Sequence, residues 1–157
     1  MINPNDLVRA MVTAFLNIPE LVPQMAAVAP IVAYVDNHPA SLGKAVYQMQ
    51  PGSVLVAWNE THLREGETEP WAHAVEIYVR ALRGRSSLDL AVLLVNGIPD
   101  PGDGLPWRYC PLMPGVLPTL VEPIVRTSDA EQIDFVTVST ETLETGDTLP
   151  ARAKGRK

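Results

Sequence analysis

The sequence has one cysteine, no leader-like N-terminus and no long apolar run. With Cys110 alone, no disulfide can form within the chain. No N-terminal stretch combines a basic start, an apolar segment and a small-residue cleavage site, so we expect a protein that folds in a reducing cytoplasm. The longest apolar runs, such as 90–95, are far shorter than the roughly 20 residues that span a bilayer, so we expect no membrane segment.

Charged residues are also scarce, at 19%, whereas apolar residues reach 46%, which is typical of a folded chain. A length of 157 residues suits one domain with one core. We therefore predict a single domain over residues 1–148 and a basic, flexible tail over 149–157. The tail is either passive or contacts an acidic partner surface.

Most of the chain is acidic. Four of the 12 basic residues lie in the last eight, PARAKGRK, so residues 1–149 carry 8 bases against 18 acids. An acidic surface repels phosphate, so we do not expect the domain to bind DNA.

The first part of the chain predicts helices and one short strand. Apolar residues over 7–16 recur with helical spacing, and Asn5 or Asp6 can cap that helix. Prolines then interrupt the pattern. We expect a second short helix over 21–28, a brief strand over 31–35 and another helix over 41–49.

The most regular pattern is a β-hairpin. The segments SVLVAWNETHL and WAHAVEIYVRAL predict two strands, joined by the polar loop REGETEP. Alternation in the second strand places His73, Val75 and Ile77 on one face and Glu76 and Tyr78 on the other. One face should be buried, and the other should be wet or covered by a partner.

The second half predicts a helix, a long loop and a last strand. Ser86 or Ser87 can cap the segment LDLAVLLVNGI, which is apolar on nearly all sides and should form the most buried helix. Seven prolines from Pro99 to Pro123 predict a loop. The segment IDFVTVSTETL predicts a strand with apolar residues on both faces, so both faces should be partly covered.

This order of elements shows neither an internal repeat nor regular alternation of strands and helices. It predicts an α+β fold, with an antiparallel or mixed β-sheet, helices packed on it and a long Pro-rich loop before the last strand.

Candidate catalytic and metal-binding residues form no recognised pattern. Asp100 and Asp103 lack the spacing of a calcium loop, so we interpret them as a solvated turn. The three histidines form no close ligand pair, unless the hairpin register places His62 opposite His73. We interpret Cys110 as an idle thiol, because a catalytic thiol needs a base and an electropositive setting. We predict no enzyme activity, no metal and no cofactor.

Large amphipathic side chains often anchor protein interfaces. Our interface candidates are Trp58, Tyr78, Trp107 and Tyr109. Several glutamates accompany the aromatic residues of the hairpin, which argues against a stacking platform for single-stranded nucleic acid.

Taken together, the hairpin, the apolar helix, the Pro-rich return and the final stretch IVRTSDAEQIDFVTVSTETLETGD resemble the tail-terminator, or tail-completion, proteins of long-tailed bacteriophages. The likeness covers most of residues 5–148 and lies in the element order and in the acidic, Thr-rich end of the closing strand. Two features depart from that family's pattern: the many prolines from Pro99 to Pro123 and the tail PARAKGRK.

The resemblance implies an α+β subunit that assembles with copies of itself into a ring, commonly of six. Such a ring caps the tail tube and meets the head-side connector in the neck of the virion, after assembly in the host cytoplasm. DNA passes through it without specific binding, and no active site is implied. We expect neighbouring subunits to cover the remaining edge or second face of the closing strand.

Two alternatives stay open. A head-closure or adaptor protein of the same neck is also a small ring subunit. From a different class, a small-ligand-binding domain or enzyme would be built around residues 99–123. Acids within 60–76 or 129–147 either face the lumen of a ring and repel DNA, or simply keep the protein soluble.

Overall fold

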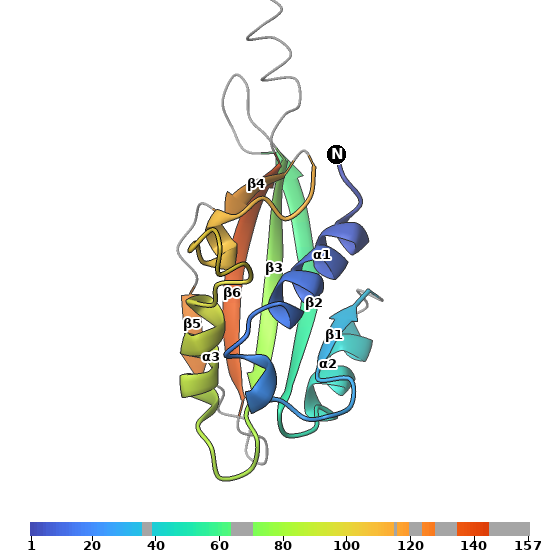
Figure 1. Ribbon diagram of the computed structural model, residues 1–157. Coiled ribbons are helices and arrows are strands. Elements are labelled where there is room, and N and C mark those ends of the chain that lie inside the picture. Colours follow the sequence, from blue (N-terminus) through green and yellow to red (C-terminus); the bar gives the residue numbers. More distant parts are fainter. Residues whose placement is uncertain (36–38, 64–70, 115, 120–123, 128–134, 145–157) are drawn as a thin grey trace, which may run out of the picture.

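One mixed β-sheet organises the chain. The computed structural model describes residues 1–35, 39–63, 71–114, 116–119, 124–127 and 135–144. Six strands in this part of the chain have the order β1-β2-β3-β6-β4, and β5 also pairs with β6 (Figure 1). Only the β1–β2 pair is parallel among these pairings. The strands are β1 (Ile31–Tyr34), β2 (Ser53–Leu63), β3 (Trp71–Arg80), β4 (Val116–Thr119), β5 (Ile124–Thr127) and β6 (Val136–Glu144).

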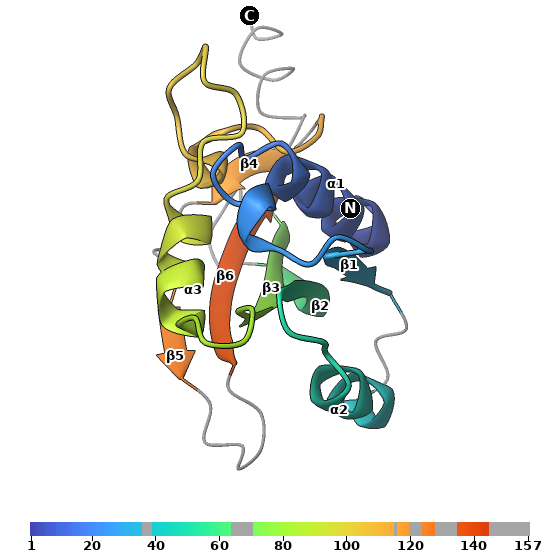
Figure 2. The same cartoon turned by 60° about the horizontal axis from the view of Figure 1, so that its bottom comes forward.

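Helices pack on both faces of this sheet, so the predicted α+β class is confirmed. They are α1 (Pro4–Leu16), α2 (Pro39–Tyr47) and α3 (Ser87–Val95), with short 3₁₀ turns η1 (Val22–Gln24) and η2 (Trp107–Tyr109). In β2, Val54 and Val56 pack into the main core with α1 and α3, whereas Leu55 and Ala57 pack into a smaller cluster with α2. Successive strand residues point to opposite faces, so α2 lies across the sheet from the other two helices (Figure 2).

Helix α1 has its N-cap two or three residues earlier than the predicted Asn5 or Asp6. Asn3 is its N-cap and accepts a hydrogen bond from the Asn5 amide at 2.9 Å, and Pro4 occupies the first turn. Proline has no amide hydrogen to lose there and its φ suits the helix, which explains the earlier start. Most of the predicted apolar face is confirmed, since Leu7, Val8, Met11 and Phe15 are fully buried, whereas Leu16 at its end is 46% exposed.

The hairpin has the predicted strands, but its register differs from a simple pairing. Trp58 pairs with Val75 and Glu60 with Ala74, so Asn59 is an extra residue that forms a β-bulge. The bulge places Thr61, not His62, opposite His73. Residues 64–70, the predicted connecting loop, lie outside the described part of the chain.

Two predicted features differ in the structure. The helix expected over 21–28 is reduced to η1, between prolines at 19 and 30. The Pro-rich segment was expected to be mostly loop, but it contains η2 and β4. Proline is tolerated in β4 because this is an edge strand, and its register shifts between Val116 and Thr119.

Strand β6 does not have a free edge. One side pairs with β3, and the other side pairs with β4 near its end and with β5 near its start. Of the two surfaces of β6 that we expected neighbouring subunits to cover, the edge is therefore excluded, and a contact through the second face stays a prediction. Both faces of the sheet are covered here as predicted, because Val138 lies in the main core and the preceding Phe135 lies in the α2 cluster.

Among the described helices α3 has the largest share of buried residues, four of nine against four of 13 in α1, as predicted. Ser86 caps α3 as predicted, accepting a hydrogen bond from the Asp89 amide at 3.1 Å. However, Leu88 and Val92 are 44% and 47% exposed. A helix that lies on one side of a sheet buries only one face, so an apolar circumference leaves apolar side chains on the surface.

Candidate functional site

The four predicted interface residues lie in different environments. Trp107 is fully buried: its ring packs edge-on against Phe15 at 4.9 Å, and its Nε1 donates to the Leu94 carbonyl at 2.8 Å. The prediction of Trp107 as an interface residue is therefore wrong. Its indole anchors the segment that follows α3 to the core, a role that residue type alone does not distinguish from an interface role.

Trp58 and Tyr78 are half-buried, and both contact other side chains of the sheet. The Trp58 indole donates to Thr61 Oγ1 at 2.7 Å. The Tyr78 ring lies 6.1 Å from that of Phe135, and its hydroxyl donates to a Glu76 oxygen at 3.3 Å.

Tyr109 is the most exposed of the four candidates, at 44%. The guanidinium of Arg108 lies over its ring at 4.4 Å from the centroid. Tyr109 therefore remains available for a protein contact.

Seven of the 11 exposed large apolar side chains in the described residues belong to two groups on separate parts of the fold, whereas Met1, Leu16, Val22 and Leu63 lie outside both. The first group, which we call the α2 flank, comprises Val28 and Val32, before and within β1, and Tyr47 at the end of α2. The second, the α3 flank, comprises Leu88 and Val92 of α3, with Leu105 and Tyr109 in the segment that follows. Sequence reasoning named Tyr109 but missed the other members of both groups, because exposed apolar residues have the same periodicity as buried ones.

Each flank is close to a hollow. A groove of about 560 Å³ opens beside the N-terminal half of α3, and it is lined by Gln24, Ala81, Leu82, Gly84, Arg85, Ser86, Asp89, Leu90 and Leu93. A smaller hollow of about 160 Å³ lies between β1 and α2, with Val32, Ala45 and Met49 in its wall. The groove contains no residue of 99–123, the segment around which a ligand site was expected.

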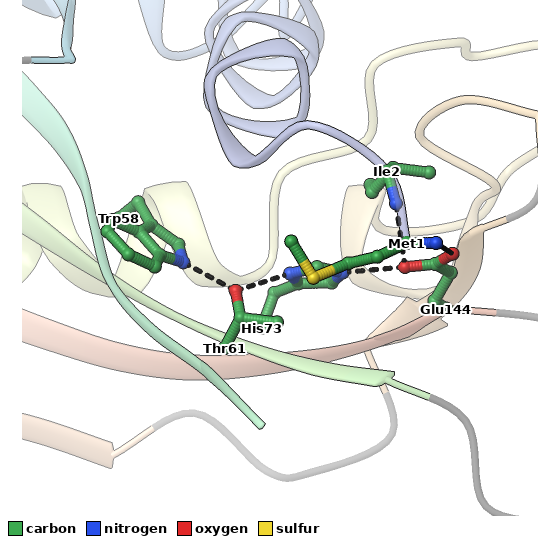
Figure 3. Close-up of polar contacts among 6 residues, drawn as sticks. All are labelled: Met1, Ile2, Trp58, Thr61, His73 and Glu144. Carbon is green, nitrogen blue, oxygen red and sulfur yellow. Dashed lines mark hydrogen bonds and ion pairs between the residues drawn. The ribbon is translucent and has the colours of Figure 1, made fainter. Parts of the chain in front are cut away.

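A polar cluster links β2, β3 and β6 at the end of the sheet opposite the two hollows (Figure 3). Thr61 Oγ1 lies 2.9 Å from His73 Nδ1, and His73 Nε2 lies 3.0 Å from Glu144 Oε2. The β-bulge in β2 turns Thr61 to the core face, where it meets His73. His73 is fully buried, so these partners satisfy both of its ring nitrogens without water.

Glu144 connects the polar cluster to the first two residues of the chain. Its Oε2 accepts a hydrogen bond from the Ile2 amide at 3.0 Å, and its Oε1 lies 3.4 Å from the amino group of Met1. Burial raises the pKa of the Glu144 carboxyl, but the hydrogen bonds from Ile2 and His73 and the charge of the amino group outweigh it, so the pKa lies below its ordinary value. The carboxylate is therefore ionised at neutral pH.

The order hydroxyl, imidazole and carboxylate is also that of a catalytic triad. Here the Thr61 oxygen already accepts the Trp58 indole hydrogen, and the imidazole is fully buried. We interpret the cluster as a structural network of hydrogen bonds. It connects β2, β3, β6 and the residues just before α1.

No family model, curated protein or solved structure matches this chain.

The remaining chemical candidates, Asp100, Asp103 and Cys110, lie in the segment that follows α3. Asp100 forms an exposed turn and accepts a hydrogen bond from the Gly102 amide at 3.0 Å. Burial raises the pKa of the Cys110 thiol, and Asp103 and Asp100 raise it further, so the thiol is protonated and weakly nucleophilic at neutral pH. Over the described ranges, no three histidine, cysteine or acidic side chains gather as a metal site would require. Nor does any helix in these ranges have the length and apolar character to cross a bilayer.

Acids gather on the sheet face that carries α2, beyond the end of the sheet that α2 covers. His62 lies between Glu60 and Glu141, with its nitrogens 3.5 and 3.9 Å from their oxygens. Glu76 lies further along the same face and accepts a hydrogen bond from the Ser139 hydroxyl at 2.6 Å. We call Glu60, Glu76 and Glu141 the acidic face.

Proposed function

We propose that this protein is a ring-forming tail terminator of a long-tailed bacteriophage, which caps the tail tube and joins it to the head-side connector in the neck of the virion. The observation that carries the proposal is the pair of exposed apolar groups on different parts of one chain. Large exposed apolar side chains that cluster mark protein contacts. When the two contacting surfaces differ, copies join head to tail and close into a ring if the rotation permits.

The position of the two flanks supports a closed ring over an open filament. The smaller hollow of the α2 flank includes residues just before β2, and the groove of the α3 flank includes residues just after β3. The start of β2 pairs with the end of β3, so both lie at the same end of the sheet. Copies that join through these two flanks lie at about the same level along the axis of the assembly, as a closed ring requires.

The acidic face supports the passage of DNA through such a ring without binding. Its carboxylates repel phosphate over roughly 8–10 Å at ordinary salt. We infer that this face lines the lumen.

The first experiment measures the mass of the purified protein in solution and images the particles without imposed symmetry. We expect rings, commonly of six copies, and binding to purified tail tubes. A protein that stays monomeric even with tail tubes present would contradict the proposal. Binding to DNA-filled heads in place of tubes would favour a head-closure protein of the same neck.

A further inference from the structure

The largest exposed side chain of the α2 flank is that of Tyr47. It is the last residue of α2 and is 63% exposed. Within the described part of the chain, the Tyr47 side chain makes neither a hydrogen bond nor a ring contact. An exposed tyrosine on a rigid helix supplies a large contact area at a small entropic cost, which is why this residue type is enriched among interface anchors.

The groove beside α3 has the shape and lining to receive such a side chain. Leu82, Leu90 and Leu93 supply apolar surface inside it, while Arg85 and Asp89 supply polar groups. Arg85 is held by Gln24, whose Oε1 accepts its Nη1 hydrogen at 2.8 Å. A tyrosine that enters the groove can bury its ring against the leucines and keep its hydroxyl near the polar groups.

The groove lining contains Arg85 as well as Asp89, but the Arg85 guanidinium donates to Gln24, so Asp89 is the lining charge that can pair with a cation of a partner. Lys44 precedes Tyr47 by one helical turn, so the two side chains lie on the same side of α2. Asp89 belongs to the lining of the groove. Neither Lys44 nor Asp89 forms an ion pair with the described residues, so each is available to an opposite charge.

We propose that Tyr47 of one subunit inserts into the groove beside α3 of a second copy, with Lys44 facing Asp89 across the contact. This inference rests on the proposed ring, and it names the contact that builds it. The occupant is a second copy, because one chain carries both the exposed tyrosine and the matching groove at the same end of the sheet.

Truncation of the anchor provides the first test. Tyr47→Ala should raise the protein concentration at half-assembly by about tenfold or more, which is the effect of losing one anchor at an interface. Leu63→Ala is the control, since it removes another large exposed side chain, 54% exposed, that lies outside both flanks and outside the groove, and it should leave assembly unchanged. Equal effects of the two substitutions, or none from Tyr47→Ala, would overturn the inference.

Charge reversal provides a test that does not depend on lost contact area. Lys44→Glu and Asp89→Lys should each weaken assembly, because each places like charges across the contact. The double variant Lys44→Glu/Asp89→Lys should regain it. An equimolar mixture of the two single variants should also assemble, since alternating subunits pair opposite charges throughout a ring with an even number of copies.

Thermal unfolding of every variant separates a lost contact from a lost fold. A folded double variant that assembles no better than the single variants would overturn the Lys44–Asp89 pairing. If the wild-type protein forms rings and all these substitutions leave them intact, the inference fails and the proposed function stands. A wild-type protein that never self-associates, even on tail tubes, would contradict both the inference and the proposed function.

Discussion

The residue that constrains the core most is His73. A buried imidazole costs free energy unless its two nitrogens find partners, because water is excluded. Thr61 and Glu144 provide those partners from two different strands. The network is therefore sensitive to the charge of Glu144, the only acid that contacts the imidazole within the described residues.

Glu144→Gln tests this sensitivity. The pKa of Glu144 is lowered in the folded state from its ordinary value of 4.5, so its ionised form stabilises the fold above that pH. The contribution is lost as the pH falls through the folded pKa. We expect Glu144→Gln to lower the free energy of unfolding at pH 7 by about 1 kcal/mol, as loss of a charge-assisted hydrogen bond does.

Urea denaturation between pH 3 and pH 7 measures the effect, with Glu20→Gln, an exposed site, as the control. The difference between Glu144→Gln and wild type should shrink at the acid end of this range. A difference that is equally large at both ends would show that the charge of Glu144 is not responsible.

Among the elements, the turn that leads into β2 is constrained by both its backbone conformation and its neighbours. Gly52 has a φ of +76°, its amide donates to the Arg80 carbonyl at 2.9 Å, and its carbonyl accepts the Ala26 amide hydrogen at 2.7 Å. A Cβ at this position would lie 2.6 Å from Leu82 Cδ2 and 2.8 Å from the Ala26 nitrogen. This turn holds β2, the end of β3 and the segment before β1 together.

Replacement of two glycines separates backbone strain from close packing. Gly84 also has a positive φ, of +79°, but a Cβ there meets only open space. Gly84→Ala should cost about 1 kcal/mol for the left-handed backbone alone. Gly52→Ala should cost about 2 kcal/mol more than that, because backbone and side-chain atoms must also move. Denaturant midpoints measure both, and equal losses would mean that the turn relaxes freely.

At the scale of the whole molecule, charge is divided between surfaces. The acidic face lies at one end of the sheet, whereas Arg83 and Arg85 follow β3 at the other end. Such a division has little effect on the fold, but it decides which surface can lie close to DNA.

Glu60→Lys/Glu141→Lys reverses the charge of the acidic face. Assembled rings of this variant should retain DNA at low salt and release it as salt rises, since cation–phosphate contacts are salt-sensitive. Filter binding at two salt concentrations measures the retention. Glu20→Lys/Asp103→Lys changes the net charge equally at exposed positions elsewhere, and an equal retention of DNA by both variants would exclude the acidic face as the wall of the lumen.

The sequence by itself determined the α+β class, the hairpin, the buried stripe of α1 and the cap of α3. These features depend on local periodicity and local hydrogen bonding, which are properties of neighbouring residues in the chain. Asn3 and Pro4 also carried a recognisable start signal for α1, although Asn5 and Asp6 offered a competing one.

Only the tertiary structure decided which aromatic and apolar residues are buried. Trp107 and Tyr109 are two residues apart, yet one lies in the core and the other on the surface, because η2 turns only the first toward Phe15. The contact between His73 and Glu144 spans 71 residues and depends on strand order, which local pattern does not encode. The groove beside α3 depends in the same way on segments as distant as Gln24 and Leu93, so it appears only when the sheet has brought them together.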